Sequence, residues 1–446
     1  MKDLIIYQSN GEQELFVKKG IHQVKASNTT ADSIIVTIDE TETYQEIDGF
    51  GASFTDSSAY LINQVLDKEQ RTELMETLFS RDKGIGLSVL RNPMGASDYA
   101  REIYSYNDID AGETDFQLEQ FTIEHDLEDI IPLLKEAVAL NPDIKLMASP
   151  WSPPAWMKTS GSMKGGELKE ECYQVYAAYF VKYIQAYKEH GLSIYAITPQ
   201  NEPLYVPDHY PGSFMPAERQ VEFIKNYLKP NFLKFGLNTK ILCYDHNWDR
   251  PDYPLHVLDH AGDGVDGVAW HWYGGEPAAQ HQVQMAFPNK EVHFTEGSGG
   301  EWIPAFEPAF SNVLRTGIEI LRNDSKSFVL WNMALDEENG PFVPGFGEST
   351  CRGIVKIEQK TNALTYTLDY YALAHFSKFV QPKAVRIATT SDEVIRSVAF
   401  KNPDGSIVTI LFNDSDEMKT VQLIQQGNEI LHCNLAAKAA MTILKK

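Results

Sequence analysis

The sequence has few cysteines, and they form no recognisable motif. Its four cysteines, Cys172, Cys243, Cys351 and Cys433, lie far apart and include no CxxC pair. This spacing argues against a disulfide framework or a structural zinc cluster and is typical of reduced thiols. We therefore expect a cytoplasmic protein.

Long apolar runs are also missing. The apolar run near the N-terminus, Leu4–Tyr7, is too short for the core of a signal peptide. No stretch approaches the ~20 apolar residues that a helix needs to cross a bilayer. The sequence predicts no integral membrane segment, and secretion would require a leader outside this sequence.

Basic residues are in clear deficit. The chain has 39 Lys and Arg against 62 Asp and Glu, which gives a net charge of −23. A surface this negative repels phosphate backbones and anionic lipids, so nucleic acids and membrane surfaces are disfavoured as partners. A neutral substrate fits this charge better, although the charge also serves solubility. The composition does not indicate an oligomeric state.

Motifs for bound cofactors are missing as well. No GxGxxG run lies between a predicted strand and a helix, and the chain has neither a Walker loop nor an HExxH motif. We expect no cofactor and no catalytic metal. His246, His271 and His293 do lie near predicted strand ends, where a metal-dependent hydrolase would place its ligands. That alternative predicts loss of activity with a chelator.

The chain is long, and its composition is that of a folded protein with a large core. Its 446 residues suit a large barrel with an accessory unit. The hydrophobic fraction is 43% and the aromatic fraction 11%, values typical of a folded globular protein. Aromatic side chains also provide the flat apolar surfaces on which sugar rings pack.

The middle of the chain alternates short apolar runs with amphipathic helical stretches. The clearest helix is Glu171–His190, followed by Gly191 at the position of a C-cap, and a second is Asp126–Leu140. Eight strands alternating with helices predict a (β/α)₈ TIM barrel over residues 45–380. These strands are Gln45–Ala52, Gly86–Asn92, Lys145–Trp151, Tyr195–Asn201, Thr239–Asp245, Asp266–Trp272, Glu291–Glu296 and Ser327–Met333.

The sequence predicts several short strands at each end of the chain. Residues 1–44 contain three of them and residues 381–446 contain five, with a hairpin signal at Asn402–Ser406. We predict that the two ends together form a β-sandwich side domain. The predicted C-terminal strands are Glu393–Phe400, Ile407–Phe412, Lys419–Ile424, Glu429–Asn434 and Ala440–Leu444, and the N-terminal ones are Leu4–Gln8, Leu15–Lys19 and Ser33–Glu40.

Polar and aromatic residues gather at the carboxyl ends of the predicted barrel strands, where barrel enzymes carry their chemistry. Two carboxylates stand out, since Glu202 closes the fourth strand and Glu296 closes the seventh. These strands face each other across a small barrel. Hydrolysis of a glycosidic bond needs one carboxylic acid to protonate the leaving oxygen and one carboxylate to meet the cationic sugar. The residues therefore predict a glycosidase.

These motifs resemble those of glycoside hydrolase family 30, the glucosylceramidase family, within the clan of retaining (β/α)₈ glycosidases. The resemblance runs in order from about residue 45 to residue 380, and the strands at both ends resemble the family's side domain. It is carried by Asp48–Asp56, Arg91–Pro93, Ser97–Tyr99, Ser149–Lys158, Thr198–Pro203, His271–Tyr273, Phe294–Glu296, Trp331–Asn332 and His375–Phe379.

The resemblance implies roles for the two carboxylates and their neighbours. Glu202 is similar to the acid/base of the family and Glu296 to its nucleophile, which makes the enzyme retaining. Asn201 resembles the ligand of the sugar 2-hydroxyl, Arg91 a buried partner of the carboxylates, and Tyr273 a neighbour of the nucleophile. We expect Tyr273 to keep Glu296 ionised and this charge to raise the pKa of Glu202.

The resemblance also implies a sugar pocket. Asp98, Trp151 and Trp331 match positions that bind the hydroxyls of a terminal glucose in the glucosylceramidase branch. His271 fits a hydrogen-bonding role in the carboxylate network. The loops Gly161–Leu168 and Glu337–Cys351 differ from those of the lipid-hydrolysing members, so the aglycone stays open between ceramide, an oligosaccharide and an aryl group.

The sequence thus predicts an exo-acting β-D-glucosidase of the glucosylceramidase type, with a place in carbohydrate or sphingolipid metabolism. Alternatives on the same framework are a β-1,6-glucanase, a β-xylosidase, a β-fucosidase and a β-galactosidase. A catalytically inactive carbohydrate-binding protein is the alternative outside the enzymes, and the presence of both carboxylates speaks against it.

Overall fold

The computed structural model describes residues 4–10, 14–25, 33–301 and 309–446. Eight parallel strands close into a barrel in the order β10-β11-β4-β5-β6-β7-β8-β9. The predicted (β/α)₈ fold is confirmed, and each predicted strand corresponds to one barrel strand. Their bounds are β4 Gly49–Ser53, β5 Val89–Pro93, β6 Lys145–Ser149, β7 Ile194–Ile197, β8 Lys240–Asn247, β9 Gly267–His271, β10 Glu291–Glu296 and β11 Ser327–Leu330.

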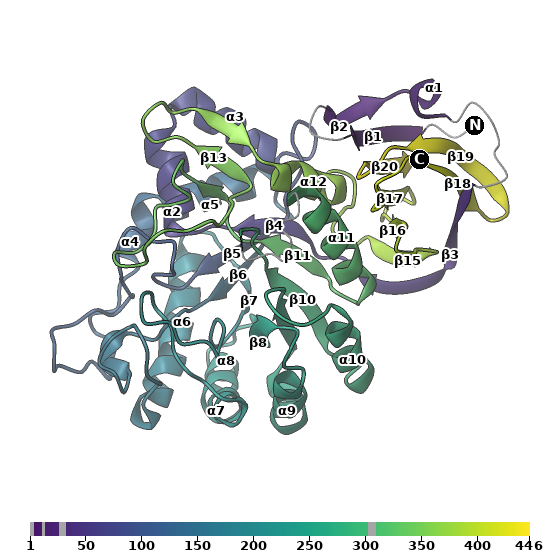
Figure 1. Ribbon diagram of the computed structural model, residues 1–446. Helices are drawn as coiled ribbons and strands as arrows, with labels where there is room; N and C mark the ends of the chain where they lie inside the picture. The colour runs from purple at the N-terminus through teal and green to yellow at the C-terminus, as the bar shows by residue number, and fades with distance from the viewer. Residues whose placement is uncertain (1–3, 11–13, 26–32, 302–308) are drawn as a thin grey trace.

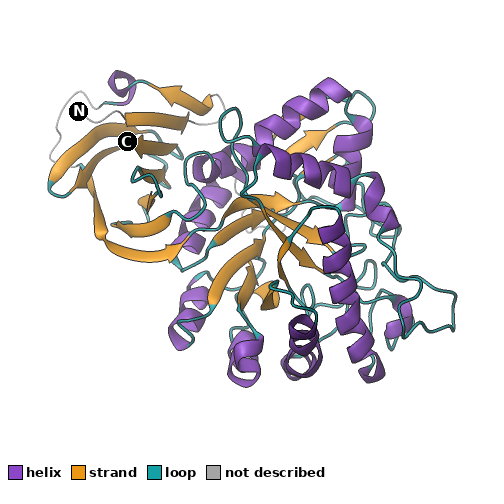
Figure 2. Ribbon diagram, turned by 180° about the vertical axis from the view of Figure 1, so that it is seen from behind, coloured by secondary structure: helices purple, strands orange, loops and turns teal. Residues whose placement is uncertain are grey.

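Helices surround the barrel and shield its strands from solvent (Figures 1 and 2). The predicted helix at Glu171–His190 is α6, whose buried stripe includes Tyr176, Phe180 and Tyr187. The helices are α2 Asp56–Tyr60, α3 Lys68–Phe79, α4 Glu124–Glu128, α5 Ile130–Leu140, α6 Tyr173–Glu189, α7 Ala217–Phe223, α8 Lys229–Lys234, α9 Asp252–Ala261, α10 Ala278–Ala286, α11 Ala309–Arg322 and α12 Leu368–Ser377.

The helix predicted over Asp126–Leu140 is divided into α4 and α5. Pro132 explains the break, because a proline cannot donate a hydrogen bond to the residue four positions earlier, and its ring crowds that carbonyl. That residue is Glu128, the last of α4. Its carbonyl instead accepts a hydrogen bond from the Asn63 amide at 3.2 Å.

The barrel interior is filled by side chains rather than open. Its core includes Val89, Met147, Ala196, Leu242 and Val329, which come from five different strands and are 3% exposed or less. These side chains fill the barrel, so a substrate cannot bind inside it. The open end at the strand carboxyl termini is therefore where a site can form.

Segments from both ends of the chain join in one nine-stranded sheet, as predicted, and β1 pairs with β20 in it (Figure 1). The strand β15 was not predicted. The strand order is β19-β18-β3-β15-β16-β17-β20-β1-β2. The bounds are β1 Leu4–Asn10, β2 Glu14–Lys19, β3 Ile34–Glu46, β15 Val385–Thr389, β16 Ile395–Lys401, β17 Ile407–Asn413, β18 Lys419–Gln425, β19 Asn428–Leu435 and β20 Ala440–Lys445. The short helix α1, Ile21–Val24, lies beside it.

This side sheet curls around a core of its own. Ile6 of β1, Ile38 of β3, Leu411 of β17 and Leu431 of β19 belong to one buried cluster. Strands from distant places in the sheet can share a core in this way when the sheet folds back on itself, as in a sandwich. The predicted hairpin is present, with the Asn402 amide donating to the Ser406 carbonyl at 2.9 Å.

A small three-stranded sheet, absent from the sequence prediction, follows the last barrel strand. It consists of β12 Ala334–Leu335, β13 Val355–Ile357 and β14 Leu364–Tyr366. The segment between β12 and β13 forms one side of the open barrel end. Among the described residues, none of the helices is long and apolar enough to cross a bilayer.

Candidate active site

A cavity of about 490 Å³ opens at the carboxyl end of the barrel strands. Its volume is in the range of binding sites for small ligands. Seven of the nine predicted site residues line it, namely Asp98, Trp151, Asn201, Glu202, Tyr273, Glu296 and Trp331. Arg91 and His271, predicted as supporting residues, lie behind this lining and contact it.

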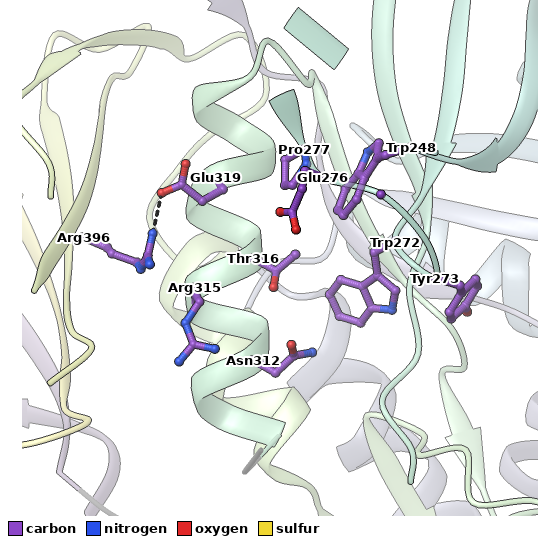
Figure 3. Close-up of a pocket in the computed structure, with 11 residues that line it drawn as sticks. Trp248, Trp272, Tyr273, Glu276, Pro277, Asn312, Arg315, Thr316, Glu319 and Arg396 are labelled. Carbon is purple, nitrogen blue, oxygen red and sulfur yellow. Dashed lines mark hydrogen bonds and ion pairs between the residues drawn. The ribbon is translucent and has the colours of Figure 1, made fainter. Parts of the chain in front are cut away.

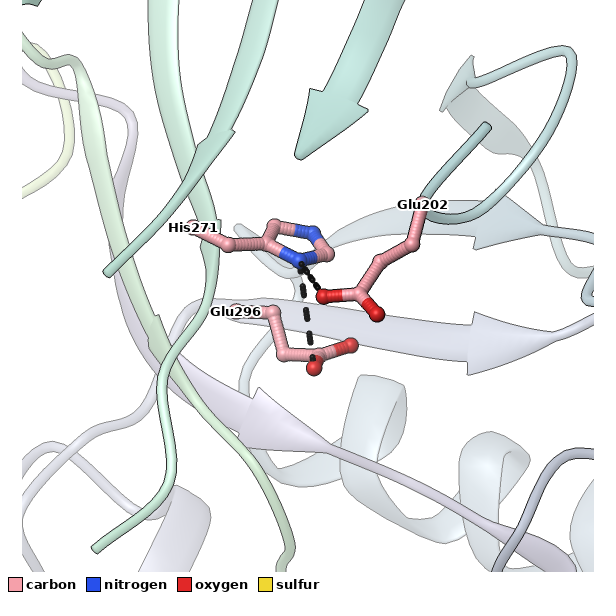
Figure 4. Close-up of side chains that lie close together, drawn as sticks. All are labelled: Glu202, His271 and Glu296. Atoms are coloured by element: carbon pink, nitrogen blue, oxygen red, sulfur yellow. Dashed lines mark hydrogen bonds and ion pairs between the residues drawn. The ribbon is translucent and has the colours of Figure 1, made fainter. Parts of the chain in front are cut away.

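Glu202 and Glu296 face each other across this cavity. Glu296 is the last residue of β10, and Glu202 lies in the loop after β7. The loop is held by backbone hydrogen bonds from Asn201 to the Pro150 carbonyl and from Glu202 to the Asp245 carbonyl, at 2.8 and 3.0 Å. One carboxylate oxygen of each glutamate and a nitrogen of His271 all lie within 4.8 Å of one another (Figure 4).

Arg91 links Glu296 to Asn201, the residue before Glu202, and to Asp245. Its guanidinium donates to Glu296 Oε2 at 2.6 Å, to Asn201 Oδ1 at 2.7 Å and to Asp245 Oδ2 at 2.8 Å. The side chain is 1% exposed, so these charge-assisted bonds form away from bulk water. The nearby carboxylates outweigh the effect of burial and raise the pKa of Arg91. The arginine stays charged and fixes the position of Glu296.

Asp245 was not predicted as a site residue, yet it lies at the centre of this network. The register of β8 against β9 shifts between Tyr244 and His246, and Asp245 has a positive φ of 62°. This irregularity breaks the strict alternation of side chains along the strand. Burial opposes ionisation, but Arg91 and His271 hold the pKa of Asp245 well below its usual range.

His271 joins Asp245 to Glu202. Its Nε2 lies 2.9 Å from Asp245 Oδ1, and its Nδ1 lies 3.1 Å from Glu202 Oε1. Burial alone would lower the pKa of the imidazole. The charges of Glu296 and Asp245, with the two hydrogen bonds, outweigh burial and raise the pKa of His271 to about 9. The ring therefore carries a proton on both nitrogens at neutral pH.

The pKa shifts of the two glutamates differ from the prediction. Burial raises the pKa of Glu296, and the charge of Glu202 adds to this effect. Burial would also raise the pKa of Glu202, but the hydrogen bond from His271 and the charge on the neighbouring imidazoles lower it. His271 was predicted to hydrogen-bond within this network, but its effect on the pKa of Glu202 was not. One shift is upward and the other downward, so the surroundings of the two carboxylates differ in electrostatic character.

Tyr273 contacts Glu296 as predicted. Its hydroxyl donates to Glu296 Oε1 at 3.0 Å and accepts a hydrogen bond from the Ser298 amide at 3.1 Å. Burial and the charge of Glu296 raise the pKa of Tyr273 well above its usual range, so the phenol stays a donor. Both oxygens of Glu296 thus accept hydrogen bonds, one from Arg91 and one from Tyr273.

The other wall of the cavity is formed by Trp151 and Trp331, whose rings stack with centroids 4.9 Å apart. Within the described part of the chain, neither indole N–H has a hydrogen-bond partner. Asp98 lies beside them, and its buried Oδ1 likewise has no partner among the described residues. Burial, with the charges of Glu296 and Glu202, raises the pKa of Asp98 well above its usual range.

Glu202, His271 and Glu296 could in principle present ligand atoms to a metal ion. A metal needs a lone pair on the imidazole nitrogen. Nδ1 of His271 is instead protonated and directed at Glu202, as the raised pKa of the ring indicates. The donor set therefore fits an ion-pair network better than a metal site.

Residues 47–380 match the glycosyl hydrolase family 30 TIM-barrel domain, and residues 383–443 match the glycosyl hydrolase family 30 beta sandwich domain. An endo-1,6-β-D-glucanase of Neurospora crassa is 35% identical over 396 residues, which cover 85% of this chain and 81% of the relative.

Two further comparisons agree on the family. The lysosomal acid glucosylceramidase of Mus musculus is 30% identical over 417 residues, which cover 88% of this chain and 79% of the relative. A solved endo-β1,6-glucanase has a TM-score of 0.90 at 32% identity, and the match covers 100% of this chain and 99% of that one. The predicted resemblance is confirmed: the chain belongs to glycosyl hydrolase family 30 and is a glycoside hydrolase.

Proposed function

We propose that this glycoside hydrolase is an endo-acting β-1,6-glucanase that cleaves its substrate by double displacement. The main observation in support is the short distance between Glu202 and Glu296. A carboxylate oxygen of one lies within 4.8 Å of a carboxylate oxygen of the other. Carboxyl groups about 5–5.5 Å apart are typical of retaining glycosidases, whereas inverting enzymes need about 6.5–9.5 Å to admit a water molecule.

In the proposed mechanism, Glu296 attacks the anomeric carbon while Glu202 gives its proton to the departing glycosidic oxygen. The reaction needs a proton on Glu202 and a negative charge on Glu296. Arg91 and Tyr273 both donate to Glu296, and these hydrogen bonds hold its oxygens in place for the attack. In the second step Glu202 removes a proton from water, which attacks the anomeric carbon and releases Glu296.

We assign recognition of the sugar in the cleavage site to Asp98, Trp151, Trp331 and Asn201. The two indole N–H groups can donate to sugar hydroxyls, and the unpartnered Oδ1 of Asp98 can accept from one. A buried polar atom without a partner costs about 1–3 kcal/mol, which a hydroxyl of the substrate would relieve. Asn201 is already held by Arg91, which leaves its N–H₂ group to face the substrate.

Two observations support a polymeric β-1,6-glucan as the substrate. The Neurospora relative and the solved structure, 35% and 32% identical, are both named as endo-1,6-glucanases. The cavity also extends beyond the carboxylates along Tyr205, Tyr210 and Phe346, and Tyr205 is 46% exposed. Exposed rings in a cleft suit further sugar units. These observations favour the β-1,6-glucanase alternative over the exo-β-glucosidase of the sequence prediction.

The test is the product pattern on a linear β-1,6-glucan. We expect early release of a ladder of oligosaccharides and a rapid fall in mean chain length, with the new reducing ends formed first as the β-anomer in proton NMR. Release of glucose alone would show exo action. Glucosylceramide should be assayed in parallel, because the mouse relative is a glucosylceramidase. Faster cleavage of that lipid, with the glucan intact, would contradict the proposal.

A further inference from the structure

A second cavity, of about 300 Å³, lies between the barrel and the side domain (Figure 3). The loop after β9 forms one side, α11 forms the opposite side, and Arg396 of β16 closes one end. Tyr273 lines both this cavity and the catalytic one. The two spaces are therefore adjacent, and one polymeric ligand could contact both.

An aromatic side chain borders the cavity on the barrel side. The Trp272 indole N–H donates to the Ser298 carbonyl at 3.1 Å, and its ring packs against Phe294 with centroids 5.7 Å apart. Gly297 lies so close to the ring that an added Cβ would be 2.6 Å from it. These contacts fix the ring, while its remaining surface faces the cavity (Figure 3). A rigid apolar ring is the surface on which the C–H groups of a sugar pack.

Polar side chains face this ring from across the cavity. Asn312 and Thr316 are one turn apart on α11, so they share a helix face. Their side chains, and the carboxylate of Glu276 across the cavity, have no hydrogen-bond partner among the described residues. All three point into the same space (Figure 3). An amide, a hydroxyl and a carboxylate match the hydroxyl groups of a carbohydrate.

The charged residues at the far end are already paired. Arg396 donates to Glu319 at 2.9 Å and to Asp414 at 2.8 Å, and Arg315 donates to the same Asp414 at 2.5 Å. The cavity lining as a whole contains two guanidinium groups, of Arg315 and Arg396, and two carboxylates, of Glu276 and Glu319. A paired network of this kind offers no excess positive charge for a phosphate or another anion, so it favours a neutral ligand.

We propose that this second cavity is an accessory binding site for a glucosyl unit of the same neutral β-glucan chain that is cleaved next to it. The inference rests on the proposed function for the identity of the glucan. Its own basis is the combination of a fixed indole ring, polar groups on α11 that have no partner among the described residues, a lining with equal numbers of guanidinium and carboxylate groups, and a shared wall at Tyr273.

The test compares a long substrate with a short one in the full-length enzyme. The double variant Asn312→Ala with Thr316→Val removes the polar groups and spares Trp272, which contacts the loop of the nucleophile. We expect the ratio of kcat/KM on β-1,6-glucan to kcat/KM on an aryl glycoside of the β-1,6-linked glucose disaccharide to fall about tenfold. The matched control is Asn226→Ala with Thr72→Val, two exposed residues of the same types on the barrel helices, which should leave the ratio unchanged.

A second readout separates this inference from the proposed function. Binding of β-1,6-glucan is measured by affinity electrophoresis in the Glu296→Gln background, where no turnover occurs. Weaker binding in the double variant supports the accessory site. An unchanged ratio and unchanged binding, with wild-type enzyme that cleaves the glucan, overturn the accessory site alone. Failure of the wild-type enzyme to bind or cleave the glucan overturns both.

Discussion

At the scale of single residues, the site is a balanced network of buried charges. Arg91 and His271 lie among Asp245, Glu202 and Glu296, so each charge faces a group of opposite sign. Asp245 is fully buried, and leaving its charge without a partner there would be strongly destabilising. Its carboxylate also accepts hydrogen bonds from Ser149, Thr198 and Thr295.

This network gives the protein a pH dependence that can be assigned to His271. Its pKa is about 9 in the folded protein and 6.5 without the fold, so between these values the folded state holds a proton that the unfolded chain has lost. The stabilisation is complete below about pH 6.5 and is lost as the pH rises through about 9. We expect the free energy of unfolding to fall across this range in the wild type.

The His271→Gln variant should lack this fall while being less stable throughout. Urea unfolding at about pH 6 and about pH 9.5 measures the difference, with His260→Gln, at an exposed histidine, as the control. Parallel pH dependence in the wild type and in His271→Gln would show that the ring is neutral in the folded protein, and the charge balance described above would fail.

At the scale of elements, one buried lysine strengthens the junction between the loop after β6 and the loop after β7, which are also joined by backbone hydrogen bonds from Gly212 to Met163 and from Phe214 to Gly166. Lys158 is 0% exposed, and its Nζ donates to the Met163 carbonyl at 2.9 Å and to the Gly212 carbonyl at 2.5 Å. Burial lowers the pKa of Lys158 to about 7. The second loop also carries Tyr205 and Tyr210, which line the catalytic cavity.

We predict that Lys158→Met loosens this junction and raises KM for β-1,6-glucan about fivefold, with a smaller change in kcat, because the two hydrogen bonds of Nζ are lost while the backbone hydrogen bonds between the loops remain. Steady-state kinetics with the polymer give both values. Lys182→Met is the matched control, since Lys182 also donates to a backbone carbonyl, that of Leu118, at 2.7 Å. Equal effects of the two substitutions, or a loss confined to kcat, would argue against a positioning role for Lys158.

The barrel strands and the two catalytic carboxylates could be predicted from the sequence, each for its own physical reason. Barrel strands such as Lys145–Ser149 are buried on both faces and give clear apolar runs. The carboxylates Glu202 and Glu296 were found because barrel chemistry gathers at strand ends. The strand β15, in contrast, was missed because Pro382 and Lys383 precede it and Arg386 interrupts its apolar pattern.

Other features depend on three-dimensional contacts that no local pattern reveals. Asp245 enters the site through an irregularity in β8, so its position on the strand gave no indication of its direction. The pKa order of the two glutamates depends on His271, which is 69 residues from Glu202 in the chain. The proposal of a β-1,6-glucan as substrate rests on comparison with relatives, since the carboxylates alone fit several glycosides.

At the scale of the whole molecule, the barrel and the side domain are joined through buried polar contacts. His375 of α12 lies between Ser9 of β1 at 2.8 Å and Thr442 of β20 at 2.9 Å. Arg315 of α11 binds Asp414, which follows β17. Because both ends of the chain contribute to this junction, we expect the two parts to unfold together.

His375, at this junction, should make the stability of the folded protein sensitive to acid. Burial lowers its pKa to about 3, so as the pH falls from 6.5 toward 3 the unfolded chain binds a proton that the folded protein excludes. The folded state therefore loses stability as the pH falls through this range. We predict that His375→Gln reduces this acid sensitivity, as measured by thermal unfolding at about pH 4 and about pH 7. Unaltered acid sensitivity in the variant would contradict a buried neutral histidine at the junction.

The central claim is that Glu296 forms a covalent bond to the sugar while Glu202 moves the proton. The most direct measurement is to incubate the enzyme with an activated 2-deoxy-2-fluoro-β-glucoside, whose fluorine slows release of the bound sugar, and to map the label by mass spectrometry of peptides. The account predicts one fluorosugar per chain on the peptide that contains Glu296, and no label on Glu296→Gln. Label on Glu202 or elsewhere, or an unlabelled enzyme that forms the α-anomer from its substrate, would contradict it.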